Sequence, residues 1–332
     1  MMKNTVTLLA VAACIALMST PAAAQPVRHV VLIQGASGEP QFAEQHRAWL
    51  DQVATTMRDA FTIGPAQLSL LVEKVEQAGA GERRATAEEV RATFARLAQS
   101  VNASDIVFVM LIGHGTGEGE AAKFNLIGPD LTVAEWNALL TPIKGRVVFV
   151  NTASVSFPFA AGLTGDRRIV ITATAVPAQR YSTIFADGFA KALTAPEGDL
   201  DKNGRISMWE AFTYASRLQK QHFEQKGLLV TERALIEDNG DGVGRDAAST
   251  TGDDGMLATM TYLDAVVETR PTDSALQMLL QRQDLLTQQV DDLRRKKATM
   301  PSAEYEVAWE KLMVDLATLG AEIRKKGGGG TD

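Results

Sequence analysis

The chain has 332 residues, of which 45% are hydrophobic and 22% are charged, and its formal net charge is -7 at pH 7. This composition is typical of a globular protein that can bury a full core, and it excludes a disordered chain. The excess of acidic residues argues against nucleic acid or an anionic membrane as a partner.

Residues 1–24 have the pattern of a secretory signal peptide. Lys3 precedes an apolar run over residues 5–18, and three alanines at 22–24 form a small-residue cleavage site. A membrane anchor is the alternative, but the run is shorter than the ~20 residues that a spanning helix needs. We therefore expect cleavage before Gln25 and a periplasmic or secreted mature protein without a membrane anchor.

The single cysteine, Cys14, lies inside this segment. Residues 11–14 imitate a lipoprotein processing box, which leaves lipidation at Cys14 as an alternative to simple cleavage. The apolar run continues past this point to Met18, however, and a better cleavage site follows. The expected mature chain has no thiol, which excludes disulfides, thiolate nucleophiles and cysteine metal sites.

The region 25–196 alternates between apolar runs that read as strands and segments with helical spacing. Such alternation predicts an α/β protein with a mostly parallel sheet and helices on both faces, that is, a three-layer α/β/α sandwich. The expected helices cover 41–61 and a segment beginning at Thr86, and the expected strands cover 29–35, 67–73, 105–115, 146–154 and 167–175.

Two of these strands end in residues that could support chemistry. The third expected strand ends in Gly113-His114-Gly115, and the next ends in the sequence Asn151-Thr152-Ala153-Ser154. The carboxyl edge of a parallel sheet is where α/β proteins bind their ligands. The sequence therefore places its candidate site at this edge.

With these strand ends, residues 27–189 resemble the caspase-like peptidases of the legumain, gingipain and metacaspase type. In that family, a strand ending in His-Gly supplies the base and the end of the next strand supplies a cysteine. The resemblance implies a caspase-like sandwich, with His114 at the base position and Ala153 at the cysteine position. Because alanine has no nucleophilic atom, it implies a pseudopeptidase whose cleft holds a peptide or protein without cleaving it.

Three roles remain open for these strand ends. In the first, the chain is an active hydrolase that uses Ser154 as nucleophile and His114 as base. Neighbouring residues on a strand point to opposite faces, however, so Ser154 should point away from the direction of Ala153. In the second, His114 only packs at a strand end. In the third, which the missing cysteine favours, the edge is a non-catalytic binding cleft.

The stretch DLDKNGRISMWE, from Asp199 to Glu210, matches the twelve-residue EF-hand calcium loop. Gly204 occupies the sharp turn, and both flanking segments have helical apolar spacing. We expect Ca²⁺ to bind here, within a segment covering 197–270; the alternative is a solvated acidic turn between helices. The expected ligands are the side chains of Asp199, Asp201, Asn203 and Glu210, the carbonyl of Arg205, and a water held by Ser207.

A second acidic turn, from Glu237 to Asp246, looks like a degenerate calcium loop. Asp241 and Gly242 have the right relation to one another, but the twelfth position falls on Ala248. The turn is either a weak partner of the first loop or a simple Asn-Gly and Asp-Gly turn. We favour the simple turn.

The apolar spacing of residues 271–326 predicts a helical hairpin of the coiled-coil type, and the composition of residues 327–332 predicts a flexible tail. Apolar residues recur at alternating spacings of three and four, as in a coiled-coil seam, and a short break at 299–302 makes the two helices antiparallel. The remaining apolar face either docks on the body or binds a partner, including a second copy. The seam residues are Leu279, Leu286, Val290 and Leu293 in the first helix, and Tyr305, Trp309, Leu312, Leu316, Leu319 and Ile323 in the second.

Overall fold

The computed structural model of the chain describes residues 26–75, 81–177, 179, 182–249, 254–264, 274–297 and 299–327. The expected signal peptide with Cys14 and the tail after Gly327 lie outside these ranges. Within the described part of the chain, no helix combines the length and apolarity that crossing a bilayer requires.

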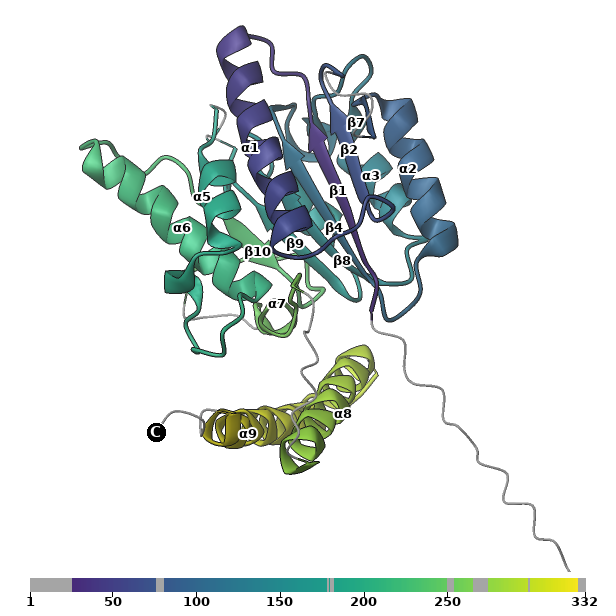
Figure 1. Cartoon of the computed structure of the whole chain (residues 1–332), viewed down its shortest axis with the longest axis vertical. Helices are drawn as coiled ribbons and strands as arrows, with labels where there is room; N and C mark the ends of the chain where they lie inside the picture. The colour runs from purple at the N-terminus through teal and green to yellow at the C-terminus, as the bar shows by residue number, and fades with distance from the viewer. Residues whose placement is uncertain are drawn as a thin grey trace, which may run out of the picture.

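A seven-stranded sheet forms the middle layer of the body (Figure 1). Its order is β10-β9-β8-β4-β1-β2-β3, and every neighbouring pair is parallel except β10 with β9. The central strands are uninterrupted apolar runs because both of their faces are covered. The strands are β1 (Arg28–Gln34), β2 (Leu68–Val72), β3 (Glu82–Arg84), β4 (Ile106–Ile112), β8 (Arg146–Asn151), β9 (Arg168–Thr172) and β10 (Leu235–Glu237).

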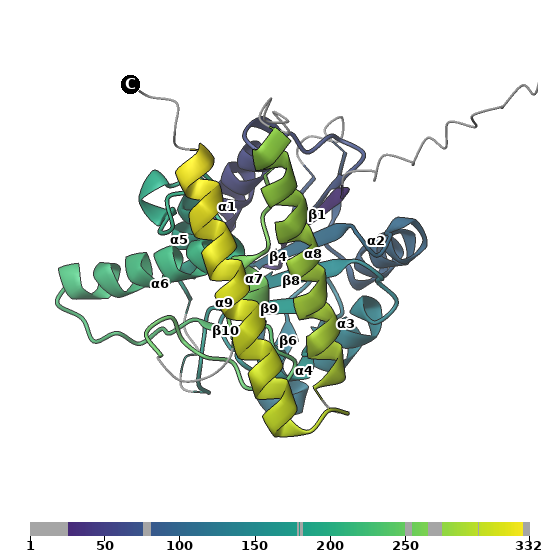
Figure 2. The same cartoon turned by 90° about the horizontal axis from the view of Figure 1, so that it is seen from below.

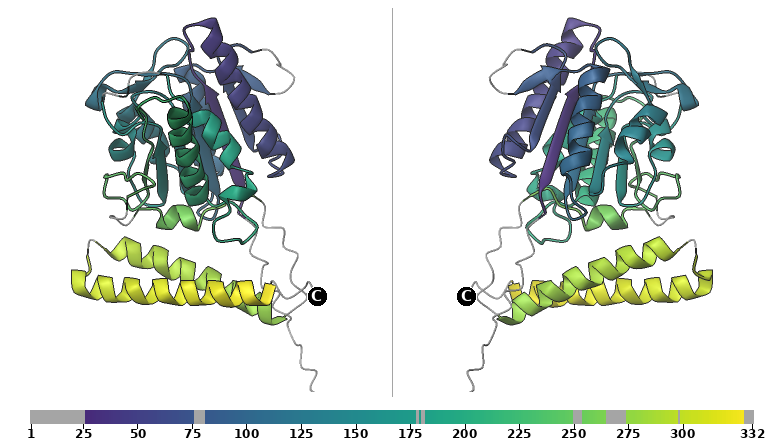
Figure 3. Two further views of the ribbon diagram at one scale, coloured as in Figure 1. Left: turned by 90° about the vertical axis from the view of Figure 1, so that its left-hand side faces the viewer. Right: turned by 90° about the vertical axis from the view of Figure 1, so that its right-hand side faces the viewer.

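Helices cover both faces of this sheet, which confirms the predicted α/β/α sandwich (Figure 3). Each face has its own hydrophobic cluster, because successive strand residues point to opposite sides. Phe108 stacks on Phe189 with ring centroids 6.4 Å apart on one face, while Val109 belongs to the cluster on the other. The first face carries α1 (Pro40–Asp59), α5 (Phe185–Ala192) and α6 (Met208–Gln225), and the second carries α2 (Ala87–Ser100), α3 (Val133–Leu140) and α4 (Pro158–Gly162).

A small three-stranded sheet, which the sequence did not predict, lies next to the end of β4. It consists of β5 (Gly115–Thr116), β6 (Lys123–Phe124) and β7 (Leu131–Thr132), with a 3₁₀ turn at Gly119–Ala121. The backbone N–H of Asn125 donates to the carbonyl of His114 over 3.0 Å. The Gly-rich segment after β4 is therefore partly held by backbone pairing.

The segment 197–264 is built into the body. β10 adds an antiparallel strand to the edge of the main sheet, and its central residue Ile236 lies in the same hydrophobic cluster as Val30 of β1. Leu257, in the short helix α7 (Met256–Thr259), and Leu263 belong to that cluster too. This part of the chain thus completes the core that the earlier strands begin.

Two antiparallel helices, α8 (Ser274–Lys296) and α9 (Ser302–Gly327), form the predicted hairpin (Figure 2). The hairpin lies against the body on the side of α7, as Figures 1 and 3 show. A guanidinium nitrogen of Arg294 donates to the backbone carbonyl of Asp238 in the body. The most buried residues of the predicted seam are Leu286, Val290, Leu293 and Leu319.

We expect a chain that ends at Arg270, and so lacks the hairpin, to keep a folded body. The two hydrophobic clusters of the body reach no further along the chain than Leu263 and contain no hairpin residue. The measurement is cooperative thermal unfolding followed by near-UV circular dichroism. A molten or insoluble product would mean that the hairpin is part of the folding unit.

Candidate functional site

The loop Asp199–Glu210 connects a 3₁₀ turn (Pro196–Gly198) to the start of helix α6. Ser207 is the N-cap of the helix, and its hydroxyl accepts from the N–H of Glu210 over 3.2 Å. The carboxylate of Glu210 accepts in return from the N–H of Ser207, which completes a capping box. Glycine is required at position 204 of the sequence, where φ is +81°.

Three carboxylates converge in this loop. One oxygen each from Asp199, Asp201 and Glu210 can be chosen so that all three lie within 4.8 Å of one another. Among the described residues, this is the acidic group whose geometry could hold a metal ion. Carboxylate oxygens are the ligands that Ca²⁺ prefers. Asp199 and Asp201 are more exposed than Glu210, which is 4% exposed.

Backbone N–H groups hold two of these carboxylates in place. Asp199 accepts from the N–H groups of Asn203 and Gly204 over 3.1 and 2.9 Å. Glu210 accepts from the N–H of Leu200 over 2.8 Å and from that of Asp201 over 3.3 Å, so it joins the start of the loop to its end. Each oxygen of Asp199 accepts one of these bonds and keeps a second lone pair for an ion. Both oxygens of Glu210 already accept two bonds, because the N–H and the hydroxyl of Ser207 donate to the second oxygen, so an ion would have to replace some of them.

Asn203 is an expected ligand whose amide nitrogen, and not its amide oxygen, points toward the carboxylates. Its Nδ2 donates to Asp201 over 2.9 Å and to the Tyr262 hydroxyl over 3.1 Å, while its Oδ1 accepts from the N–H of Arg205. Binding an ion through Oδ1 therefore requires this amide to turn. The other expected ligand atoms come from a loop that is already folded.

Burial raises the pKa of Asp201, and the neighbouring carboxylates of Glu210 and Asp199 raise it further. Hydrogen bonds from Asn203 oppose this shift in part. The like-charge contribution is the repulsion that a cation between the three groups would relieve. The electrostatics of the loop thus favour a bound positive charge.

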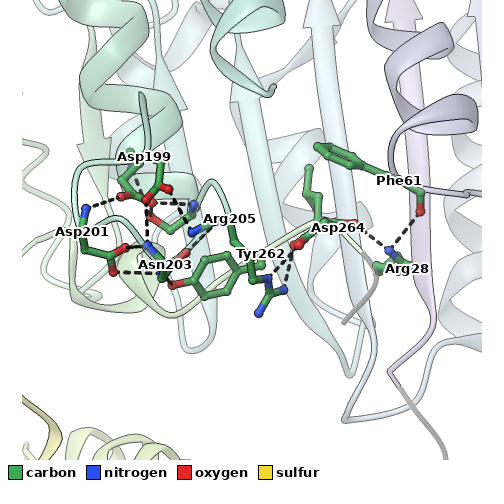
Figure 4. A network of polar contacts seen from close by, with 12 residues as sticks. Arg28, Phe61, Asp199, Asp201, Asn203, Arg205, Tyr262 and Asp264 are labelled. Atoms are coloured by element: carbon green, nitrogen blue, oxygen red, sulfur yellow. Dashed lines mark hydrogen bonds and ion pairs between the residues drawn. The ribbon is translucent and has the colours of Figure 1, made fainter. Parts of the chain in front are cut away.

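The extended segment 261–264 lies alongside the end of the loop (Figure 4). Ser207 pairs with Tyr262 in an antiparallel bridge, and the N–H of Met208 donates to the carbonyl of Thr261 over 2.8 Å. Arg205 makes a two-pronged ion pair with Asp264, with both N–O distances 2.7 Å, and its guanidinium lies 4.0 Å from the centroid of the Tyr262 ring. Sequence reasoning missed this contact, because the segment has no motif and reaches the loop only through the fold.

The second acidic turn does not pair with the first loop. Its own strand residue Ile236 bridges Arg245, whereas the first loop bridges the 261–264 segment. Glu237 is fully buried and one of its oxygens accepts from Gly240 over 2.7 Å. Asp241 is exposed and accepts from the N–H of Val243. Glu237 and Asp241 thus differ in burial, and each is held by backbone N–H groups of the turn itself; the simple turn stays a prediction.

The sheet-edge residues lie near the carboxyl ends of the paired strands β1 and β4. From these two neighbouring strands the chain continues into opposite halves of the sheet. This is the switch point of an open α/β sheet, at the carboxyl ends of its strands. The ring of His114 lies edge-on to Phe42, with centroids 4.9 Å apart, and 5.0 Å from the ring of His46. Burial lowers the pKa of His114, and a bond to the backbone of Ser37 opposes this in part.

His46 and Ser37 are neighbours of His114 that the sequence did not reveal. The Ser37 hydroxyl lies 3.1 Å from Nδ1 of His46, and both side chains are almost fully buried. Burial, with a smaller contribution from His114, lowers the pKa of His46 to about 4. Both rings are therefore neutral at pH 7, and they pack at the edge as uncharged aromatic groups.

The two remaining candidates, Ala153 and Ser154, lie at the end of β8. Ala153 is fully buried, and its N–H donates to Oδ1 of Asn151 over 3.0 Å. Ser154 is 3% exposed, and its hydroxyl bonds to both the N–H and the carbonyl of Gly115, over 3.2 and 3.3 Å. The structure thus brings Ser154 to the backbone beside His114, with its hydroxyl already bonded there.

The close packing of these two strand ends explains the glycine after His114. A Cβ atom on Gly115 would collide with the carbonyl oxygen of Ser154. Beyond Ser154, Val155 has a φ of +55°, an uncommon conformation for a β-branched residue. Strained backbone of this kind is found preferentially at functional sites and switch regions.

These observations define a mostly parallel α/β/α protein with a loop in which three carboxylates converge and a closely packed sheet edge. No known protein family and no curated protein sequence matches the chain. One solved structure similar to it is the protein GSU0716 from Geobacter sulfurreducens, with 14% identity and a TM-score of 0.41, covering 72% of this chain and all of that one. A likeness at this level assigns neither a family nor a function.

Proposed function

We propose that this chain is an exported calcium-binding protein with a binding or scaffolding role. The observation that supports the calcium site most directly is the convergence of Asp199, Asp201 and Glu210 within 4.8 Å. They belong to a loop whose spacing fits a calcium loop and whose backbone already holds two of the carboxylates. The signal-like residues 1–24 support export, which is tested by mass spectrometry of the mature N-terminus, expected at Gln25.

A bound ion would act on the body through helix α6. Glu210 lies in the first turn of this helix, which packs against α5 and places Phe212 in the core. The neighbouring 261–264 segment is tied to β1 as well, since Arg28 donates to the carbonyl of Leu263 over 2.8 Å. Calcium would therefore stabilise the edge of the body that carries the hairpin.

The direct test is titration calorimetry with calcium chloride on the full chain. We expect one binding event, absent in Asp199→Asn and preserved in the matched variant Glu224→Gln, which alters an exposed carboxylate at the far end of α6. Magnesium should bind more weakly, because it demands a tighter octahedral shell than this loop offers. Calcium binding that survives Asp199→Asn would place the ion elsewhere.

We further propose that the sheet edge does not hydrolyse peptides. This rests on the resemblance to caspase-like peptidases, with Ala153 at the cysteine position. The active-hydrolase alternative needs a free Ser154 hydroxyl with His114 as its base. The hydrogen bonds of Ser154 to Gly115 and its burial speak against that role.

We expect serine-directed and thiol-directed activity probes to leave the mature protein unlabelled, and a mixed peptide library to be returned intact. Labelling that disappears in both Ser154→Ala and His114→Ala would instead establish the hydrolase. Ser154→Ala should also lower the free energy of unfolding by about 0.5–1.5 kcal/mol, since it removes the hydrogen bonds between this hydroxyl and the Gly115 backbone. Peptides retained on the immobilised protein would support a binding cleft.

A further inference from the structure

Helix α9 exposes a second apolar stripe on the side opposite its buried seam. Val307 and Val314 are 70% and 58% exposed, and they are seven residues apart. Exposed alanines at 303, 317 and 321 extend the stripe at alternating spacings of four and three. This repeat is the one that packs helices into coiled coils. Seen from below, α9 lies in front of the body, so the body does not cover it (Figure 2).

Helix α8 has a similar pair of exposed residues. Met278 and Leu285 are 64% and 58% exposed and are likewise seven residues apart. Scattered exposed apolar residues are normal on a soluble protein, but pairs at heptad spacing are typical of helix-packing surfaces. The stripe of α9 lies on the side opposite its buried seam, where a further helix can pack against it.

The charges along α9 indicate what covers the stripe. Its first half carries three exposed acidic residues, Glu304, Glu306 and Glu310, against one exposed basic residue, Lys311. Its C-terminal end carries two exposed basic residues, Lys325 and Lys326, against one exposed acidic residue, Glu322. In an antiparallel pair of α9 helices, the acidic half of each helix lies against the basic end of the other. A parallel pair would instead place Glu310, the charged residue within the stripe, beside its own copy. The helix is thus complementary to itself in the antiparallel orientation.

We propose that two copies of this chain associate through the exposed stripes of their α9 helices in an antiparallel pair. The acidic half of the helix would be repelled by an anionic membrane, and the same helix supplies both partners of each charge contact. The pairing involves no residue of the calcium loop. Its failure would therefore leave the calcium proposal untouched, and the reverse holds as well.

The first test is the mass of the full chain by light scattering over a range of concentrations. We expect a dimer for the wild type and a dissociation constant raised by roughly a hundredfold or more in Val307→Glu/Val314→Glu, because the interface would then bury unpaired charges. The matched control is Val243→Glu, which makes the same change at a 69% exposed valine of the second acidic turn. Circular dichroism should show unchanged helix content, since both α9 valines face solvent in the single chain.

The second test determines the orientation by thiol cross-linking. In a Cys14→Ser background, which removes the only native thiol, we introduce either Val314→Cys or Ala303→Cys. Val314 lies near the middle of the 26-residue helix, so antiparallel copies bring this position together, while the two copies of position 303 lie on the order of 35 Å apart. We expect a short cross-linker to join only the Val314→Cys chains.

Four results would overturn the proposal. A monomer at all concentrations would exclude the pair, and a dimer that Val307→Glu/Val314→Glu leaves intact would place the interface elsewhere. Cross-linking at both positions would show a parallel pair. Binding of the monomer to anionic lipid vesicles through α9 would assign the stripe to a membrane instead.

Discussion

Calcium should raise the unfolding midpoint of the wild-type chain and leave that of Glu210→Gln almost unchanged. The ion would bind only the folded loop, so its binding free energy adds to the stability of the folded state. A loop with three carboxylates in an exported protein suits a dissociation constant of roughly 10⁻⁴ to 10⁻³ M. Calcium at about 100 times that constant should then add ~2.7 kcal/mol. Thermal unfolding in calcium, magnesium and chelator measures the effect.

The quantity to compare is the calcium-dependent shift of each variant. Glu210 also caps α6 and holds the start of the loop, so Glu210→Gln should lose on the order of 1–2 kcal/mol even in chelator. Glu224→Gln, on the exposed end of the same helix, should respond to calcium like the wild type. An equal shift in the wild type and in Glu210→Gln would mean that the loop is only an acidic turn.

Folding stability should fall as the pH rises from about 4 to about 7, and Asp254→Asn should remove a large part of this fall. Burial raises the pKa of Asp254 to about 7, and the nearby carboxylates of Asp238, Glu237 and Asp241 add to the shift. The folded state then holds a proton that the unfolded state has lost, so stability is present below pH 4 and is lost as the pH approaches 7. A shift of this size corresponds to an effect on the order of 3 kcal/mol.

Asparagine suits this test because it keeps the acceptor oxygen. Oδ1 of Asp254 accepts from the N–H groups of Asp238 and Asn239, over 2.9 and 3.3 Å, and an amide oxygen can do the same. Burial also raises the pKa of Glu237 and Asp238, so a smaller slope of the same sign should remain in Asp254→Asn. The control is Asp59→Asn, which changes an exposed carboxyl at the end of α1. The measurement is the free energy of unfolding of the wild type and each variant, from urea unfolding in chelator at pH 5, 6, 7 and 8. Parallel pH profiles for the wild type and Asp254→Asn would refute the prediction.

The strands that the sequence predicts are those whose apolar runs are unbroken. β4 is apolar at all seven positions, and the helix α2 begins directly after its N-cap Thr86, whose hydroxyl accepts from Glu89. The missed strands have two or three residues, too few to show a period. β10 is also antiparallel to its neighbour, and it reaches the sheet from a segment that follows the acidic loop Asp199–Glu210. Its position depends on contacts between residues far apart in the chain.

The candidate sites also contain residues that local sequence spacing predicts and residues that only the fold brings together. The twelve-residue spacing identifies Asp199, Asp201 and Glu210 because a calcium loop draws most of its ligands from consecutive positions. The surroundings of His114 come instead from the segment after β1 and from helix α1, so His46 and Ser37 could not be inferred from spacing. The same holds for Tyr262 beside Asn203, which the fold brings from more than fifty residues away. Local chemistry could be predicted, whereas its tertiary neighbours could not.

The bond from Arg28 to the carbonyl of Leu263 joins the first strand of the body to its last residues. During synthesis, β1, β2 and β4 emerge early, but this bond forms only after residue 263 has left the ribosome or the translocation channel. The body therefore cannot complete its structure before its last segment has emerged. Apolar surface that stays exposed until then is the kind that makes folding intermediates prone to aggregation.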